Sequence, residues 1–190
     1  GGSDNHETDT TETTEMENTS QEICLVNNKK AAYRIIYPED CSSQLSVAAD
    51  VLRSKLITLT GVPFTSRSDM FQGDDMGEII IGNCNRTEMQ NVLSTMTYRD
   101  YSVTVTDSNI LIAGYEDSKV VDAVYSFINL MTDETLVSSE GKTIFKWSGD
   151  YQKLYKNYKL ENLTIGGVSL SEYRIVYPAD AKVDEYMIDC

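Results

Sequence analysis

The chain has 190 residues, of which 41% are hydrophobic, and a formal net charge of −14. This length suits one domain, or one domain with additions. No basic stripe is present that could neutralise phosphates, which argues against nucleic-acid binding. No apolar run approaches the roughly 18 residues of a membrane-spanning helix, which argues against a transmembrane segment.

Residues 1–22 form an acidic tail that we expect to be a disordered linker. They contain seven acidic residues and no Lys or Arg, so they carry half of the net charge. Without an apolar period, the tail cannot bury enough surface to offset the entropy lost on ordering. Because the chain begins with Gly1, we expect it to be processed or cut from something longer. The tail is then either an arbitrary boundary or the spacer of an exported bacterial protein, secreted or at the cell surface, such as a lipid-anchored lipoprotein.

The first third of the chain predicts two strands and a helix. Residues 23–26 and 33–37 are strand-like, and Pro38 ends the second strand. Ser42 or Ser43 can cap the helix that follows, and Gly61 can terminate it. Its apolar residues recur at spacings of three and four, which gives one buried stripe. That stripe comprises Leu45, Ala48, Ala49, Leu52, Leu56 and Leu59.

The next segment predicts a short strand, a loop, a buried strand and a second helix. Residues 62–65 contain Pro63, which favours a position near a sheet edge. Residues 66–77 are polar and indicate a loop, whereas 78–82 are apolar enough for a strand buried on both faces. The second helix follows Arg86 and carries Met89, Val92, Leu93 and Met96 on one side.

Residues 100–114 predict an antiparallel hairpin around which the other elements are arranged. Apolar and polar residues alternate over 101–106, Asp107 to Asn109 favour a turn, and 110–112 are fully apolar. We therefore expect the second strand to be the more deeply buried. A third amphipathic helix over 120–131 and a last strand over 143–147 follow.

These elements predict an α+β fold over residues 23–147, a two-layer sandwich of one mixed β-sheet with amphipathic helices packed on it. Residues 148–162, rich in Tyr and Lys, are expected to form a connector.

Residues 163–180 repeat residues 23–40 at an offset of 140 residues. The segment YRIVYPAD over 173–180 matches YRIIYPED over 33–40 without a gap. Such a match indicates a duplicated unit, so 163–190 are expected to start a second, truncated copy in a longer protein. We expect 163–165 and 173–177 to pair as a hairpin. Because an isolated hairpin is only marginally stable in water, we expect it to dock on the first domain or to form a homodimer across an exposed edge.

The sequence contains few candidates for chemistry. His6 is the only histidine and lies in the tail, which argues against a histidine-based catalytic or zinc site in the folded part. The four cysteines, Cys24, Cys41, Cys84 and Cys190, form no CxxC pair, and sequence cannot choose among their disulfide pairings. We therefore predict no catalytic residue, no cofactor and no metal.

Two groups remain as candidates for weak glycan contact. Asp74 and Asp75, near Glu78, are explained by a solvated loop, and the alternative is a loop that contacts calcium or sugar. Tyr151, Tyr155 and Tyr158 can stack on sugar rings or pack the connector onto the domain. Acidic residues before the first and third helices, Glu39 and Asp40 and then Glu116 and Asp117, are better explained as helix-end charges.

Three segments, 78–83, 100–114 and 123–128, together resemble the non-catalytic α+β domain that precedes the barrel in family 20 β-hexosaminidases and in α-glucuronidases. The chain departs from that family at 115–118, Tyr-Glu-Asp-Ser, where a glycine-rich step is usual. In the family the catalytic Asp-Glu pair belongs to the barrel, so the resemblance implies no catalytic residue here.

The sequence hypothesis is a non-catalytic accessory or scaffold domain of an exported, carbohydrate-related bacterial protein, with a neighbouring domain of the same protein as its partner. One alternative is a stand-alone glycoside hydrolase that uses the loop carboxylates. Another is a cell-surface adhesion or ligand-capture module.

Overall fold

The computed structural model describes residues 20–149, 151–154, 164–165 and 168–169. The chain divides into two compact units, residues 1–156 and 157–190. The predicted tail over 1–19 lies outside the described residues.

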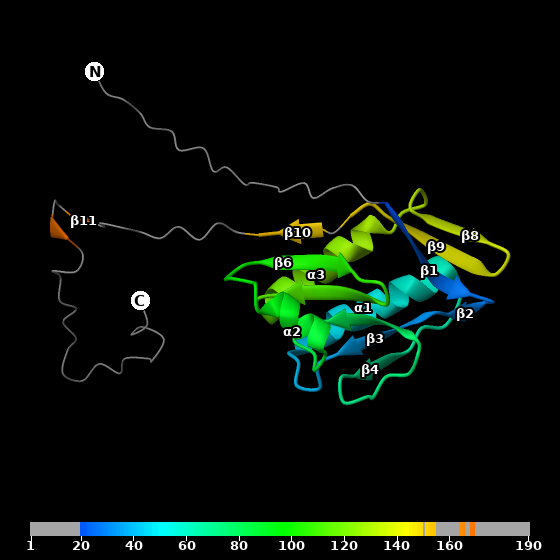
Figure 1. Cartoon of the computed structure of the whole chain (residues 1–190), viewed down its shortest axis with the longest axis horizontal. Helices are drawn as coiled ribbons and strands as arrows, with labels where there is room; N and C mark the ends of the chain where they lie inside the picture. Colours follow the sequence, from blue (N-terminus) through cyan, green and yellow to red (C-terminus); the bar gives the residue numbers. More distant parts are fainter. Residues whose placement is uncertain (1–19, 150, 155–163, 166–167, 170–190) are drawn as a thin grey trace, which may run out of the picture. The chain divides into compact units, whose positions relative to one another are not determined.

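The first unit is built on a six-stranded mixed sheet, in the order β10-β6-β7-β5-β3-β4 (Figure 1). Strands β3, β4, β5 and β7 are parallel, and the hairpin partner β6 and the edge strand β10 run antiparallel to their neighbours. The strands are β3 (Tyr33–Tyr37), β4 (Ser66–Ser68), β5 (Gly77–Ile81), β6 (Tyr101–Val105), β7 (Asn109–Gly114) and β10 (Tyr151–Lys153).

Helices cover both faces of this sheet, because its central strands are apolar at successive positions. Ile79 and Ile110 belong to the larger core, which contains the buried side chains of α1 (Ser43–Thr60) and α3 (Asp117–Leu130). Ile80 and Leu111 point to the other face, where they pack with Met89 of the short helix α2 (Thr87–Leu93). The predicted α+β sandwich is confirmed, and α2 lies on the face opposite to α1 and α3.

The predicted caps and the central hairpin are confirmed. Ser42 accepts a hydrogen bond from the backbone nitrogen of Leu45 at 3.2 Å, and Gly61 ends α1 with a left-handed φ of 72°. Strands β6 and β7 pair antiparallel from Tyr101 opposite Gly114 onward. Five of the six residues of β7 are buried, against three of five in β6, as expected for the second strand.

A second, antiparallel sheet was not part of the one-sheet prediction. Its order is β2-β1-β9-β8, with β1 (Gln21–Asn27), β2 (Lys30–Ala31), β8 (Leu136–Ser139) and β9 (Lys142–Trp147). Asn28 and Lys29 have φ angles of 49° and 60°, which turn the chain tightly from β1 into β2. Strand β1 therefore pairs with β2 and β9, and only the later strand β3 joins the mixed sheet.

Two local predictions are corrected. The edge strand expected over 62–65 lies instead at Ser66–Ser68, inside the predicted loop. The backbone oxygen of Thr65 accepts a hydrogen bond from the nitrogen of Ile35, and pairing with β3 continues from that point. Phe64 is buried in the core rather than paired. Residues 151–153, placed in the connector, form the edge strand β10.

The described part of the second unit is a small hairpin. Strands β11 (Thr164–Ile165) and β12 (Val168–Ser169) pair antiparallel, with Ile165 opposite Val168. The predicted partner segment 173–177 lies outside the described residues. The matching segment near the start of the chain also contains a hairpin, which pairs Asn27 with Lys30. Two residues connect the strands in both hairpins, but the paired positions differ by two after the offset of 140 residues.

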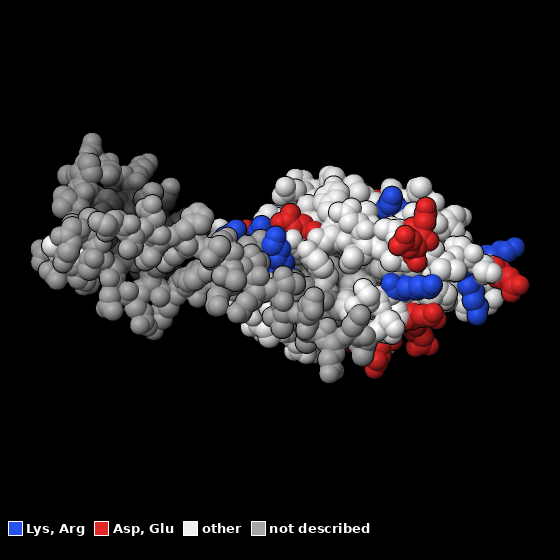
Figure 2. Space-filling view, turned by 90° about the horizontal axis from the view of Figure 1, so that it is seen from above, with Lys and Arg blue, Asp and Glu red and all other residues white. Residues whose placement is uncertain are grey.

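None of the three described helices has the length and apolar character needed to cross a bilayer. On the face of the molecule seen in Figure 2, acidic and basic side chains are interspersed.

Candidate functional site

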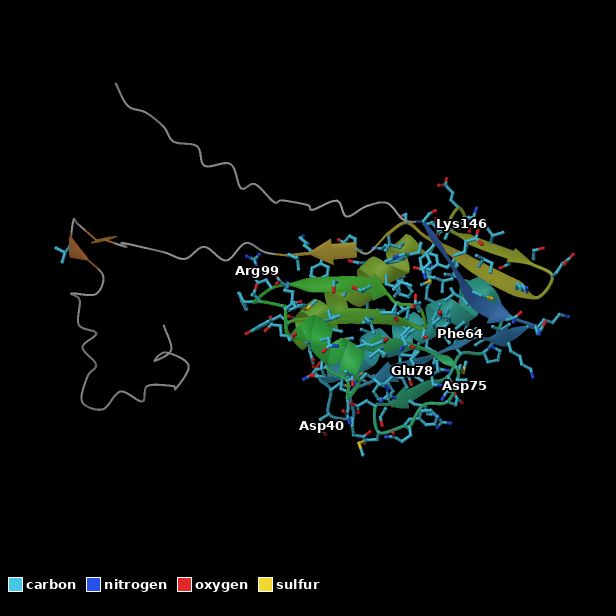
Figure 3. All side chains as sticks on the ribbon, in the orientation of Figure 1. Asp40, Phe64, Asp75, Glu78, Arg99 and Lys146 are labelled. Carbon is cyan, nitrogen blue, oxygen red and sulfur yellow. The ribbon has the colours of Figure 1, made fainter. Side chains whose placement is uncertain are left out.

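A polar groove of about 770 Å³ lies where the parallel strands β5 and β7 begin, and it brings together the carboxylates that the sequence analysis singled out. Asp74, Asp75 and Glu78 all line it, and Figure 3 shows Asp75 and Glu78 in the same region. Tyr33, Arg86 and Asn109 contribute further polar groups. The other lining residues are Gln21, Glu22, Ile23, Cys24, Ala32, Gly73, Met76, Gly77, Thr106, Asp107 and Ser108.

The sheet register sets the base of this site. Arg34, Glu78 and Asn109 are paired neighbours across β3, β5 and β7. Two residues further along each strand, the same face is apolar and packs with α2. A row of polar side chains therefore borders the smaller core. These side chains need hydrogen-bond or ion-pair partners, either among themselves or in the adjacent loop.

Glu78 and Arg86 form a bidentate ion pair. Nε of Arg86 lies 2.8 Å from Oε2 of Glu78, and Nη2 lies 3.1 Å from Oε1. Glu78 is only 6% exposed, and its carboxylate raises the pKa of Arg86, against the opposing effect of desolvation. The same guanidinium donates to the backbone oxygens of Phe71 at 2.8 Å and Asp69 at 3.1 Å. Arg86 thus ties the loop between β4 and β5 to the strand β5.

Arg34 holds the same loop from the neighbouring strand. Its Nη2 lies 2.9 and 2.8 Å from the two carboxylate oxygens of Asp74, and its guanidinium lies 4.6 Å from the centre of the Phe71 ring. The pKa of Asp74 is lowered, first by the hydrogen bond from the backbone of Met76 and then by Arg34. A lowered folded-state pKa stabilises the fold at neutral pH, and this contribution is lost as the pH falls through that pKa. The Asp74 side chain is 62% exposed, so the contribution is small.

Asp69 is the third carboxylate that holds this region. It is buried, and its two oxygens accept from the backbone nitrogens of Glu39 at 3.0 Å and Asn85 at 2.8 Å. It therefore connects the loop to the segments before α1 and before α2.

The chemistry of the groove follows from these contacts. Asp69, Asp74 and Glu78 are bound to arginines or backbone nitrogens that belong to the loop and its surroundings. Such carboxylates are acceptors in a fixed network and are poorly placed to exchange protons with a substrate. Asp75 is exposed. In the part of the chain that the structure describes, no cluster of three or more His, Cys, Asp or Glu side chains could hold a metal ion.

The remaining acidic candidates lie at helix ends. Asp117, in the first turn of α3, accepts a hydrogen bond from the backbone nitrogen of Ser42 at 3.0 Å. Its carboxylate therefore binds the N-cap residue of α1. Glu116 is the N-cap of α3 but makes no cap hydrogen bond through its side chain, which accepts from the Ser118 hydroxyl at 3.0 Å. Glu39 and Asp40 precede α1 and are exposed.

Of the three predicted tyrosines, one is described. Tyr151 lies on β10, half-buried, with its ring centre 6.2 Å from that of Tyr101. Tyr155 and Tyr158 lie outside the described residues. Sequence reasoning missed another pair, Tyr98 and Tyr115, which are 60% and 53% exposed. The sequence carried a partial signal, because Tyr115 directly follows the predicted hairpin and Tyr98 lies two residues before it.

Cys24, Cys41 and Cys84 are free thiols in the structure. Cys84 is buried, whereas Cys24 and Cys41 are half-buried. Cys190 lies outside the described residues.

No family model and no curated protein matches the chain. Solved structures that partly match the chain include the GH20 β-N-acetylhexosaminidase of Streptomyces coelicolor A3(2). The identity is 12%, the match covers 72% of this chain and 25% of that chain, and the TM-score is 0.45. The Flavobacterium johnsoniae chitobiase follows with 15% identity, 70% and 19% coverage and a TM-score of 0.42. A GH115 4-O-methyl-α-glucuronidase gives 16% identity, 63% and 17% coverage and a TM-score of 0.40. These structural neighbours are glycoside hydrolases, and the chain spans a quarter or less of the length of each.

Proposed function

We propose that this chain is a non-catalytic accessory domain that supports a neighbouring domain of an exported, carbohydrate-related protein. One observation supports the proposal that the domain is non-catalytic. The three carboxylates Asp69, Asp74 and Glu78 are bound to Arg34, Arg86 or backbone nitrogens. They are used to hold a loop, which leaves no pair of mobile carboxyl groups among them for acid–base work.

The carbohydrate relation is supported by the sequence resemblance over 78–83, 100–114 and 123–128. These segments fall on β5, on the β6–β7 hairpin and on α3. Strand β5 pairs directly with β7, and α3 packs on β7. The resembling segments therefore form one contiguous part of the domain rather than scattered pieces.

The proposed neighbour is a second copy of this fold that begins near residue 163. The sequence repeat over 163–180 supports it. The acidic composition of residues 1–22 supports a spacer in an exported or lipid-anchored protein.

A second candidate function is glycoside hydrolysis in the polar groove. One observation favours it: Asp75 is exposed and lines the groove that Glu78 also lines. A glycosidase needs two carboxyls about 5–9.5 Å apart, one of which gives and takes a proton. Glu78 would have to leave Arg86 to take part.

The experiment that separates the two functions compares hydrolysis and folding in the same variants. The full chain, Asp75→Asn and Glu78→Gln are assayed with a panel of chromogenic β- and α-glycosides, and their thermal unfolding is recorded. The accessory role predicts release of chromophore at the rate of buffer for all three proteins, and a lower Tm for Glu78→Gln alone. Turnover by the wild-type chain that Asp75→Asn abolishes with its Tm unchanged would establish the hydrolase instead.

A further inference from the structure

Tyr98 and Tyr115 form an exposed aromatic corner at the end of the central hairpin opposite its turn. Their ring centres lie 6.2 Å apart and their planes meet at 86°. The side chains are 60% and 53% exposed, so each ring keeps a large part of its surface in water. Two perpendicular rings of this kind offer one aromatic face and, beside it, the edge and hydroxyl of the second ring.

Asp100 fixes the backbone on which both tyrosines sit, through its buried carboxylate on the Tyr98 side and its backbone oxygen on the Tyr115 side. Asp100 is 3% exposed, and its Oδ2 accepts from the backbone nitrogen of Thr97 at 2.8 Å and from the Thr97 hydroxyl at 3.0 Å. The backbone nitrogen of Asp100 also donates to the oxygen of Thr97 at 3.0 Å, which closes a tight turn around Tyr98. The backbone oxygen of Asp100 accepts from the nitrogen of Tyr115 at 2.9 Å.

The corner is therefore preorganised. The backbone of both tyrosines is fixed through the same residue, Asp100, and Arg99 in the turn has a left-handed φ of 76°. A rigid aromatic surface loses little conformational entropy when it binds a ligand.

The size and chemistry of the corner decide the kind of ligand. Two half-exposed rings offer roughly 200 Å² of surface, well below the roughly 800 Å² that each partner contributes to a stable protein interface. A single sugar ring matches this size, because its C–H face is apolar and can stack on an aromatic face while its hydroxyls bond to the phenol groups. The exposed side chains of Arg99 and Glu116 follow Tyr98 and Tyr115 directly and offset each other in charge. The net charge of −14 on the whole chain then disfavours an anionic sugar.

We propose that Tyr98 and Tyr115 form a stacking site for a neutral pyranose ring of a glycan. The proposal deepens the carbohydrate relation of the proposed function and rests on it. It places glycan contact on residues other than the polar groove and the tyrosines of 151–158.

The test measures binding of the full chain by isothermal titration to three neutral oligosaccharide series, β-linked glucose, xylose and N-acetylglucosamine. An acidic galacturonic-acid series serves for comparison. The variants are Tyr98→Ala/Tyr115→Ala, the conservative Tyr98→Phe/Tyr115→Phe, and the control Tyr125→Ala, which removes an exposed tyrosine of α3.

The wild-type chain should bind at least one neutral series and bind the acidic series more weakly. Loss of both rings should weaken binding roughly tenfold or more, whereas the phenylalanine pair should stay within about threefold of wild type, since it keeps the stacking faces. Tyr125→Ala should bind as the wild type does. Binding that survives in the double alanine variant, or no binding of any neutral series by the wild-type chain, would overturn the proposal.

A second measurement covers the case in which the double alanine variant does not fold. In the wild-type chain, the ring resonances of Tyr98 and Tyr115 should shift on titration with the bound oligosaccharide, and those of Tyr125 should not. Shifts confined to other tyrosines would overturn the proposal. The non-catalytic role is tested separately by the hydrolysis assay, so a chain that neither binds nor cleaves sugars would refute the stacking site and leave the scaffold role intact.

Discussion

Arg86 holds the carboxylate of Glu78 with two hydrogen bonds, Nε to Oε2 at 2.8 Å and Nη2 to Oε1 at 3.1 Å. Because the same guanidinium also binds the backbone oxygens of Asp69 and Phe71, one side chain joins strand β5 to the loop that precedes it. The Glu78–Arg86 pair is therefore a structural contact, and the proposed non-catalytic role depends on it.

The first prediction concerns this pair. Arg86→Met leaves the carboxylate of Glu78 buried without its partner, and we expect the free energy of unfolding in urea to fall by about 3 kcal/mol. Glu78→Gln/Arg86→Met should cost clearly less than the sum of the two single changes, because it removes both charges. Lys119→Met is the control, since the Lys119–Asp122 pair is more exposed and should contribute less than about 0.5 kcal/mol. Equal losses in Arg86→Met and Lys119→Met would contradict the structural role.

The second prediction concerns the reactivity of the thiols. Burial raises the pKa of the Cys84 thiol from 9.0 to about 12, with a smaller contribution from Asp69. The thiol donates to the backbone oxygen of Ile81 at 3.2 Å. In the native protein Cys84 should therefore resist alkylation, while the half-buried Cys24 and Cys41 are modified. Peptide mapping by mass spectrometry follows each site, and Cys84 reacting as fast as Cys24 would refute the prediction.

The raised pKa also has a consequence for stability at alkaline pH. In the unfolded chain the Cys84 thiol ionises near pH 9, whereas in the folded protein it stays neutral until about pH 12. Its contribution is therefore complete below pH 9 and is lost as the pH rises toward 12. Unfolding free energies measured across this range should fall less steeply in Cys84→Ala than in the wild type. Parallel curves would show that this thiol does not titrate on unfolding.

The third prediction concerns the end of β7. A Cβ on Gly114 would lie 2.4 Å from the backbone nitrogen of Val120 and 2.6 Å from the carbonyl carbon of Lys119. Since backbone cannot yield as a side chain does, Gly114→Ala should destabilise the fold by about 3 kcal/mol or more and disturb the start of α3. Gly149→Ala is the matched control, because nothing lies within 4 Å of its Cβ position, and only the left-handed backbone should cost about 1 kcal/mol. A Gly114→Ala protein as stable as Gly149→Ala would show that α3 can move away.

The central hairpin and the main helices could be predicted because their signals are local. Alternation over 101–106, the turn residues after it and the caps Ser42 and Gly61 each specify structure within a few residues. The second sheet could not be predicted in this way. It depends on β1 pairing with β9 from the far end of the domain, and β8 is a largely exposed strand with little apolar signal.

The candidate site was predictable only in part. The carboxylates Asp74, Asp75 and Glu78 are close in sequence, which allowed them to be grouped, but Glu78 lies in strand β5 and is buried. Their partners Arg34 and Arg86 were not recognised, because the pairing of Arg34 with Asp74 follows from the parallel register of β3 and β5 rather than from any local pattern. Tyr98 and Tyr115 were missed for the same reason, since they meet only when the β6–β7 hairpin closes.

Amide hydrogen exchange in the loop between β4 and β5 tests most directly whether the charged residues of the polar groove are structural. The backbone nitrogens of Asp69, Phe71 and Met76 donate to Tyr37, Ser68 and the Asp74 carboxylate, respectively. We predict that these three amides are protected in the wild-type chain, and that Arg86→Met lowers their protection more than that of the β6–β7 hairpin. Unprotected loop amides in the wild type, or a loop unaffected by Arg86→Met, would contradict the account and make Glu78 available for chemistry.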